Sequence, residues 1–359
     1  MKISLLLFLS VFAQVAFCLV PPSDPNIQYF GRWDLSNPKI AEADWPGVYL
    51  KVVFEGTGIS VALEGQNVFE AMIDGSSSAI LGVTDSLKTF SVASGLEPGR
   101  HTLILNKRSE SQTSSTRFFG LDLPSGTKLL APPARPQRRI EFIGDSYTVG
   151  YGMESPSREP GNLSEDSLLL WTTNTPQSFG ALIAKGTGAE YQINAFSGRG
   201  LARNINGMEP KKTFGYFYGC TLMSGCNTTG KSPRWDFNSW HPQVIIIGLG
   251  INDFQGNAPY ADSTAFDMAY TKLLDSLRIK HQGVKFILCA TKVWPTEALV
   301  PRVQSIVAKE QAKGRQDISY YEYVSENTGL WFHPNLMDHQ NIARTLRPLV
   351  AKAGGWMSR

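Results

Sequence analysis

The spacing of hydrophobic and polar residues changes about a third of the way along the chain. Before that point, apolar residues occur in short runs separated by turn residues, as in Val48–Phe54, Ile59–Leu63, Phe69–Ile73 and His101–Leu105. Short strands about ten residues apart, with no long helical period between them, are typical of an antiparallel β-sandwich. We therefore predict an all-β domain over residues 19–130.

A proline-rich segment, residues 131–139, follows this region and is predicted to be a linker. After it, apolar runs that read as buried strands alternate with helical patterns. These runs are Ile140–Ile143, Glu190–Ala195, Val244–Leu249, Val284–Ala290 and Ile318–Val324. Alternation of this kind predicts a parallel sheet with helices on both faces over residues 140–359.

Two helices are predicted in the second half from their apolar periodicity. One starts at Ser263, ends before Gly283, and has apolar residues at Phe266, Tyr270, Leu273, Leu274 and Leu277. The other follows Pro334 and carries Ile342, Leu346, Leu349 and Val350 on one face. The predicted fold is thus a β-sandwich followed by an α/β/α domain.

The composition is that of an ordinary globular protein, with 42% hydrophobic and 18% charged residues. A formal net charge of +3 over 359 residues is too small to indicate a nucleic-acid partner.

The N-terminus reads as a signal peptide. Lys2 precedes an apolar stretch from Ile3 to Val20, and Ala16-Phe-Cys18 offers small residues for cleavage. A membrane anchor is the alternative, but Pro21 and Pro22 follow at once without a basic flank. We predict a signal peptide over residues 1–18, a secreted mature chain, and no membrane contact after cleavage.

Secretion agrees with three further features. The sequons at Asn162 and Asn227 would be glycosylation sites in a eukaryotic source. Cys220 and Cys226 are close enough to close a small disulfide loop, whereas Cys289, in a predicted strand, is expected to be a buried free thiol.

The segment Gly144-Asp145-Ser146 ends the first strand of the second half. Ligand chemistry in open α/β sheets takes place at the carboxyl ends of the strands. A serine at this position is either a helix N-cap or a nucleophile. Which of the two roles Ser146 has depends on whether a base and oxyanion donors lie nearby.

A serine nucleophile needs a base, and the chain has only five histidines. His333 and His339 lie near the start of the last helix, where they could approach Ser146. Two further strands end in turns that could supply oxyanion donors, at Gly198 and at Asn252. Each turn alone is ordinary, but together on parallel strands they indicate a hydrolase site.

These residues resemble the motif blocks of the SGNH (GDSL-type) hydrolases, namely Gly144-Asp-Ser146, Gly198, Gly250-x-Asn252 and His333. Other segments resemble carbohydrate esterase family two, which joins an N-terminal jelly-roll domain to an SGNH domain. They are Gly31–Asp34, Phe54–Thr57, Leu96–Thr102, Ser197–Asn204 and His333–His339. The resemblance spans nearly the whole mature chain.

The resemblance implies removal of acetyl groups from plant cell-wall polysaccharides by a serine mechanism, without metal or cofactor. It assigns Ser146 as the nucleophile and His333 as the general base. The oxyanion hole would consist of the Ser146 N–H, the Gly198 N–H and the Asn252 side chain.

One position departs from the superfamily pattern. The usual aspartate three residues before the histidine is Leu330 here. We therefore expect a Ser–His dyad in which a backbone carbonyl holds the imidazole ring of His333. Trp331 is predicted to provide that carbonyl. An acid from elsewhere, such as Asp253 or Asp338, is the alternative, and His339 is expected to cap a helix or pack.

Two further patterns are a match to a nucleotide-binding motif and a pair of tryptophans. Residues 225–232 match the P-loop expression, but no strand feeds them and Pro233 follows in place of a helix, so we interpret the match as chance. Trp294 and Trp331 should fall in loops at the catalytic edge and are predicted to contact substrate.

The leading hypothesis is a secreted, monomeric acetyl esterase acting on O-acetylated xylan, mannan or glucomannan. A GDSL-type lipase or thioesterase is a second hypothesis, which an apolar acyl groove would support. A non-catalytic carbohydrate-binding protein is the third, and it predicts a damaged site.

Overall fold

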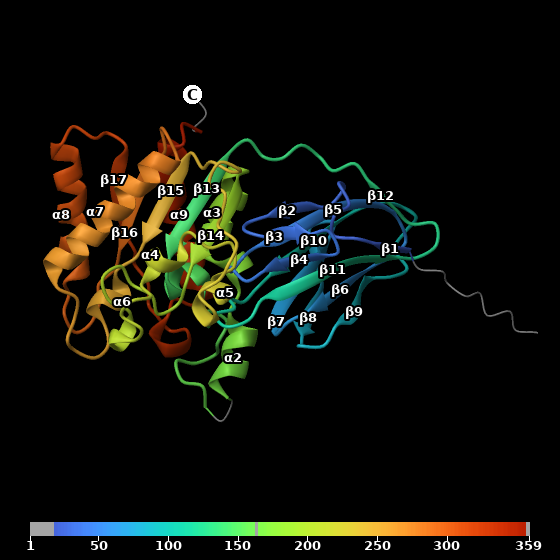
Figure 1. Cartoon of the computed structure of the whole chain (residues 1–359), viewed down its shortest axis with the longest axis horizontal. Helices are drawn as coiled ribbons and strands as arrows, with labels where there is room; N and C mark the ends of the chain where they lie inside the picture. The colour runs from blue at the N-terminus through green and yellow to red at the C-terminus, as the bar shows by residue number, and fades with distance from the viewer. Residues whose placement is uncertain (1–17, 162–163, 357–359) are drawn as a thin grey trace, which may run out of the picture.

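A computed structural model describes residues 18–161 and 164–356 of the chain. Two bodies lie side by side, an all-β domain and a domain of mixed helices and strands (Figure 1). The predicted β-sandwich followed by an α/β/α domain is therefore confirmed. Most of the predicted signal peptide, residues 1–17, lies outside the described residues, and the domain boundaries stay predictions.

One sheet of the sandwich has the strand order β3-β4-β11-β6-β9, with β1 paired to β11. Its pairings are antiparallel. The strands are β1 (Cys18–Val20), β3 (Asp34–Asn37), β4 (Ile40–Ala43), β6 (Ile59–Glu64), β9 (Lys88–Ala93) and β11 (Thr116–Leu123).

The second sheet has the order β12-β5-β10-β7-β8, with β2 paired to β5, and is also antiparallel. Its strands are β2 (Gln28–Phe30), β5 (Tyr49–Gly56), β7 (Asn67–Ile73), β8 (Ser76–Val83), β10 (Gly99–Lys107) and β12 (Lys128–Leu130). Buried alternating residues such as Leu50, Val52 and Phe54 of β5 form the core of the sandwich.

The second domain is built on a five-stranded sheet with the order β14-β13-β15-β16-β17. These strands are β13 (Arg139–Gly144), β14 (Glu190–Ala195), β15 (Val244–Gly248), β16 (Lys285–Ala290) and β17 (Ile318–Glu322), and all four pairings are parallel. Gly144 pairs with Ala195 on one side and Gly248 on the other. The turns after these three strands therefore meet at one edge of the sheet.

Helices cover both faces of this sheet. On one face Ile245 and Ile247 of β15 share a core with α7 (Ser263–Lys280) and α8 (Leu299–Ala312). On the other, Val244 and Ile246 pack with α3 (Phe179–Thr187) and α9 (Leu336–Ala353). Alternate residues of one strand thus face opposite layers, which explains why these strands are continuous apolar runs.

The predicted helices correspond to α7 and α9, and their apolar residues are buried as expected except Leu349, which is partly buried. No helices were predicted at α3, α8 or the shorter helices. The shorter helices are α1 (Ser146–Val149), α2 (Glu165–Thr172), α4 (Phe214–Phe217), α5 (Met223–Thr228) and α6 (Ile251–Phe254). The 3-10 turns are η1 (Thr175–Gln177), η2 (Ile205–Gly207) and η3 (Leu330–Phe332).

Buried polar contacts fix the sandwich against the second domain. The Arg32 guanidinium donates to the Tyr218 carbonyl and, at 3.1 Å, to the Cys220 carbonyl. The Asp44 carboxylate accepts from the backbone N–H groups of Met223, at 2.9 Å, and Ser224, at 2.7 Å. Loops of the sandwich can therefore hold defined positions next to the second domain.

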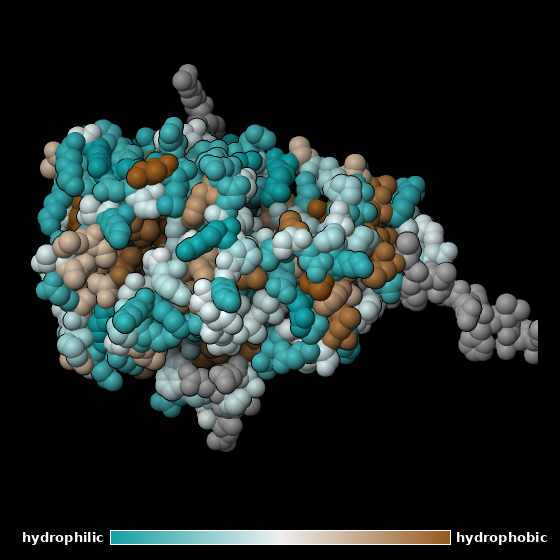
Figure 2. Space-filling model, in the orientation of Figure 1, coloured by the Kyte–Doolittle hydropathy of each residue, from teal (hydrophilic) through white to brown (hydrophobic). Residues whose placement is uncertain are grey.

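Cys220 and Cys226 form a disulfide, and Cys289 is a buried free thiol, as predicted. The face in Figure 2 is mainly hydrophilic, with hydrophobic side chains in separate patches. Within the described residues, no helix has the length and apolar character required to cross a bilayer.

Candidate active site

Ser146 lies at the carboxyl end of β13, as the first residue of α1. Asp145 caps this helix, and its side chain accepts from the Tyr147 N–H at 3.1 Å. A Cβ at Gly144 would lie 2.0 Å from Thr148 Oγ1, so only glycine allows the chain to turn this tightly. The helix cap is thus Asp145, which leaves the Ser146 hydroxyl available.

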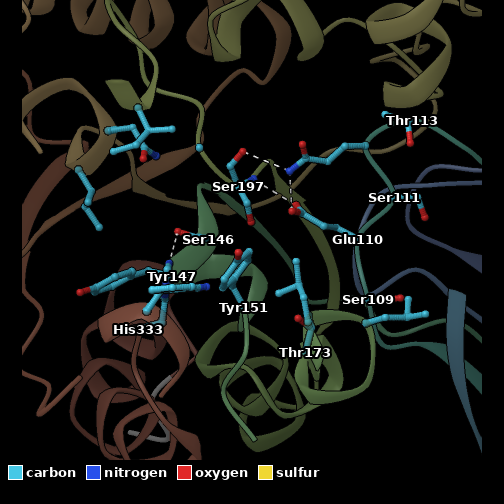
Figure 3. A pocket seen from close by; sticks show the side chains of 18 of the residues that line it. Ser109, Glu110, Ser111, Thr113, Ser146, Tyr147, Tyr151, Thr173, Ser197 and His333 are labelled. Atoms are coloured by element: carbon cyan, nitrogen blue, oxygen red, sulfur yellow. Dashed lines mark hydrogen bonds between the residues drawn. The ribbon is translucent and has the colours of Figure 1, made fainter. Parts of the chain in front are cut away.

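The structure brings Ser146 and His333 together. Ser146 Oγ lies 2.8 Å from His333 Nε2, and the two side chains face each other in Figure 3. The other ring nitrogen, Nδ1, lies 2.8 Å from the carbonyl oxygen of Leu330. We predicted the carbonyl of Trp331 in this role. The 2.8 Å hydrogen bond is made by the residue one position earlier, and the Trp331 carbonyl also interacts with the ring.

The turn before His333 explains the choice of carbonyl. Trp331 and Phe332 both have left-handed backbone angles, with φ of 51° and 59°. Two consecutive left-handed residues curl the chain so that the Leu330 carbonyl meets the backbone N–H of His333 at 3.1 Å as well as its ring. Such conformations cost roughly 1–3 kcal/mol each and cluster at functional sites.

Burial lowers the pKa of His333 to about 4, and hydrogen bonds to the Leu330 and Trp331 carbonyls partly oppose this shift. The ring of Tyr151 packs against the imidazole, with ring centroids 4.5 Å apart. At neutral pH the imidazole is therefore uncharged, and its Nε2 can accept the proton of Ser146.

The two candidate acids are engaged elsewhere. Asp253 accepts from the backbone N–H groups of residues 201–203, at 2.7–2.9 Å. Asp338 forms a capping box with Asn335 at the start of α9. Within the described part of the chain, no hydrogen bond or ion pair joins a carboxylate to His333.

His339 is buried in α9 and does not approach Ser146 by hydrogen bonding. Its Nδ1 accepts the backbone N–H of Phe179, the first residue of α3, at 3.1 Å. The residue therefore caps a neighbouring helix, in line with the role expected for it.

The predicted oxyanion donors line one cavity with Ser146 and His333. Gly198 has φ of +78°, which favours glycine in the turn after β14. The Asn252 side-chain amide donates to the Arg199 carbonyl at 3.0 Å and lies 3.4 Å from the Asp145 carboxylate. These contacts fix the amide of a residue that lines the same cavity as Ser146, where a developing negative charge could use it.

This cavity has a volume of about 900 Å³ and is lined by both domains. The loop between β10 and β11 contributes residues 109–114, which are mostly polar. Trp331 lines the cavity and is 39% exposed. Trp294, which is 82% exposed, is not among the lining residues, although its neighbour Pro295 pairs with the lining residue Gln255.

Sequence analysis missed Glu110 and Gln112, which reach the site from the sandwich. The Glu110 carboxylate accepts the backbone N–H of Ser197 at 3.1 Å, and Gln112 donates to the Ser197 carbonyl at 3.3 Å. Both residues lie in a polar loop of the other domain, so nothing in their local sequence marked them.

The P-loop match at residues 225–232 begins inside α5 and continues into the turn after it, so it lacks the strand–loop–helix context of a nucleotide site. Among the described residues, no group of three or more His, Cys, Asp or Glu side chains is arranged to hold a metal ion.

Both the sequence and the structure of this chain are similar to those of carbohydrate esterases. The family description "Carbohydrate esterase 2 N-terminal" matches residues 29–133. An acetylxylan esterase / glucomannan deacetylase of Cellvibrio japonicus is 35% identical over 326 residues, covering 87% of this chain and 86% of that protein. Cellulase/esterase CelE of Acetivibrio thermocellus is 33% identical over 93% of this chain, which spans 40% of the length of that relative.

A solved structure of a family two carbohydrate esterase from Clostridium thermocellum, in complex with cellohexaose, is similar throughout. It superimposes with a TM-score of 0.83 at 31% identity, over 92% of this chain and 100% of that chain.

Proposed function

Because the chain belongs to carbohydrate esterase family 2 and is a carboxylic ester hydrolase, we propose that it is secreted and removes O-acetyl groups from hemicellulose such as acetylated xylan, mannan or glucomannan. The observation that carries this proposal is the 2.8 Å contact between Ser146 Oγ and His333 Nε2 at the wall of a cavity of about 900 Å³. The names of the relatives favour acetylated polysaccharide as the substrate class.

In the proposed first step, Ser146 Oγ bonds to the acetyl carbonyl carbon while its proton moves to His333 Nε2. The carbonyl electron pair moves to the oxygen, where the N–H groups of Ser146 and Gly198 and the Asn252 amide would stabilise the negative charge. Collapse of this intermediate breaks the bond to the sugar oxygen, which takes the proton from His333.

In the second step, water attacks the acetyl-serine with His333 again as the base. Acetate leaves, and Ser146 recovers its proton. The Leu330 carbonyl accepts a hydrogen bond from Nδ1–H throughout, so it keeps the ring in the tautomer whose Nε2 faces the serine. A backbone dipole thus takes the place of the usual carboxylate.

The cavity wall supports a neutral, hydroxyl-rich substrate. Serine, threonine and glutamine side chains at residues 109–114 offer hydrogen bonds, and the exposed ring of Trp331 offers a flat apolar surface for a sugar. Trp294 is proposed as a contact only for longer chains, because it lies outside the lining.

A lipase or thioesterase activity is the second candidate, because the lining also includes apolar residues, namely Leu169, Leu170, Ile205, Met208 and Ile251. A non-catalytic carbohydrate-binding role is disfavoured by the contact between Ser146 and His333.

The experiment is acetate release from acetylated xylan and acetylated glucomannan, with long-chain acyl esters measured in parallel. Acetate release that the Ser146→Ala variant loses would support the proposal. Cleavage of long-chain esters alone would favour the lipase, and no ester cleavage by the wild-type protein would reject both enzymes.

A further inference from the structure

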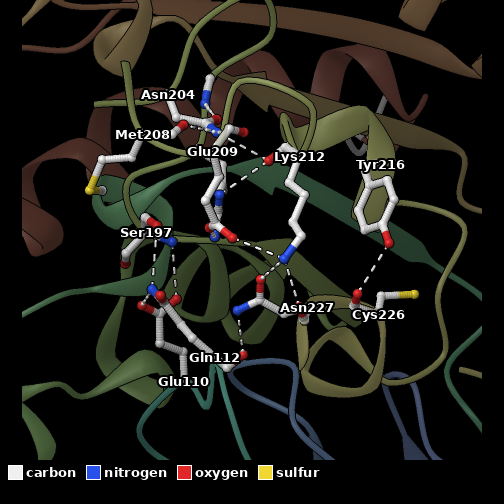
Figure 4. Close-up of polar contacts among 12 residues, drawn as sticks. Glu110, Gln112, Ser197, Asn204, Met208, Glu209, Lys212, Tyr216, Cys226 and Asn227 are labelled. Atoms are coloured by element: carbon white, nitrogen blue, oxygen red, sulfur yellow. Dashed lines mark hydrogen bonds and ion pairs between the residues drawn. The ribbon is translucent and has the colours of Figure 1, made fainter. Parts of the chain in front are cut away.

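The sandwich domain holds the two peptide units that flank the Ser197 Cα, one through Glu110 and the other through Gln112. Glu110 Oε2 accepts the Ser197 N–H at 3.1 Å, and Gln112 Nε2 donates to the Ser197 carbonyl at 3.3 Å. The same Gln112 amide donates to Glu110 Oε1 at 2.8 Å. Figures 3 and 4 show Glu110 extending from its loop towards Ser197.

The contact from Gln112 is made with the peptide unit that carries a proposed oxyanion donor, the Gly198 N–H. The Ser197 carbonyl and the Gly198 N–H belong to one peptide unit, which is planar and has the two groups pointing in opposite directions. A donor that fixes the carbonyl therefore also fixes the direction of the Gly198 N–H. Hydrogen bonding at the carbonyl further polarises the unit and makes the N–H a stronger donor.

The loop that carries Gln112 is itself anchored to the second domain (Figure 4). Asn227 Nδ2 donates to the Gln112 carbonyl at 3.0 Å, and Lys212 Nζ donates to the Asn227 carbonyl at 2.7 Å. Lys212 also pairs with Glu209, which pairs with Arg199. The contacts thus close a ring that starts and ends in the turn after β14.

We propose that Gln112 and Glu110 are positioning residues for the oxyanion hole, so that the sandwich domain contributes directly to catalysis by orienting the Gly198 N–H. This inference rests on the proposed esterase function and deepens it. Neither residue needs to touch the substrate. Gln112 holds the Ser197–Gly198 peptide directly, and Glu110 holds the preceding peptide at the Ser197 N–H and also the Gln112 amide.

The test uses Gln112→Met, which keeps the length of the side chain but removes the donor, and Gln112→Lys, which restores a donor. The matched control is Gln28→Met, because Gln28 in the same domain also donates to a backbone carbonyl, that of Pro133 at 2.9 Å, and does not line the cavity. Turnover of p-nitrophenyl acetate and the thermal unfolding midpoint are measured for each full-length variant.

We expect Gln112→Met to lower kcat about tenfold with little change in KM, a smaller loss than the 10²–10³-fold typical for deletion of a whole donor. Gln112→Lys should recover most of this loss, and Gln28→Met should retain wild-type kcat. Glu110→Ala forms a second arm that also lowers kcat, and it decides the question if Gln112→Met does not fold.

Wild-type kcat in both Gln112→Met and Glu110→Ala would overturn the inference, as would a loss confined to KM. Equal losses in Gln112→Met and Gln112→Lys would also overturn it, because the donor would then be irrelevant. A wild-type protein no more active than Ser146→Ala would instead overturn the proposed function, so the two failures are distinguishable.

Discussion

The Leu330 carbonyl oxygen lies 2.8 Å from Nδ1 of His333. Leu330 occupies the position, three residues before the histidine, where SGNH hydrolases usually carry an aspartate. The same position therefore orients the imidazole with its backbone in place of a side chain. A carbonyl has no full negative charge, so it stabilises the protonated ring less than a carboxylate does.

The first prediction concerns the pH dependence of activity. His333 must be neutral to accept the serine proton, and burial lowers its pKa to about 4. As the pH falls, kcat/KM should therefore stay high through 6.5, the unperturbed pKa of histidine, and decline only near 4. A pH–rate profile with p-nitrophenyl acetate checks this. An acidic limb at or above 6.5 would show that a negative charge supports the ring.

The second prediction separates Asp338 from catalysis. Because Asp338 caps α9 and accepts from the backbone N–H groups of Glu326 and Asn327, Asp338→Ala should lower the free energy of unfolding by about 1–2 kcal/mol. The acidic limb of the pH–rate profile should stay in place, because the carboxylate does not contact His333. Chemical denaturation and the profile measure the two effects, and a shifted limb would contradict the dyad.

The third prediction concerns the oxyanion hole. Asn252→Ala should lower kcat by roughly 10²–10³-fold, since one donor to the developing charge is lost. The Asn252 amide also donates to the Arg199 carbonyl, so the thermal midpoint has to be measured beside the kinetics. A stable variant with unchanged kcat would exclude Asn252 as a donor.

The fourth prediction uses His339, whose pKa burial lowers to about 3. Between that value and the unfolded value of about 6.5, the unfolded chain binds more protons than the native chain. The contribution of His339 to stability is therefore full above pH 6.5 and is lost as the pH falls towards 3. Replacing the residue should consequently cost less at low pH.

The measurement is the difference in free energy of unfolding between the wild type and His339→Gln at pH 7 and pH 5. Taking a difference removes the effect of buried carboxyl groups such as Asp145, whose pKa is raised to about 8 by burial and which act in the opposite direction. A difference that is the same at both pH values would contradict the assignment.

The elements that could be predicted are those whose hydrophobic pattern lies within one continuous segment of the sequence. The apolar run before Gly144-Asp145-Ser146 is a fully buried strand, and parallel register places the turns after β13, β14 and β15 together. The fold and the meeting of Ser146 with His333 could therefore be predicted. Ser146, Gly198, Asn252 and His333 all line the one cavity.

The features that escaped prediction depend on contacts between distant segments. No glycine marks the left-handed turn at Trp331 and Phe332, so the choice of the Leu330 carbonyl was not visible in the sequence. Glu110 and Gln112 reach Ser197 from a loop of the other domain.

The most direct test of the central claim is mass spectrometry of the protein quenched in acid during turnover of an acetyl ester. We predict that the peptide containing Ser146 gains the mass of one acetyl group, because the acetyl-serine precedes release of acetate. Ser146→Ala should show no such peptide and should release acetate at least about a thousandfold more slowly. Acetylation of another residue, or undiminished acetate release by Ser146→Ala, would contradict the account.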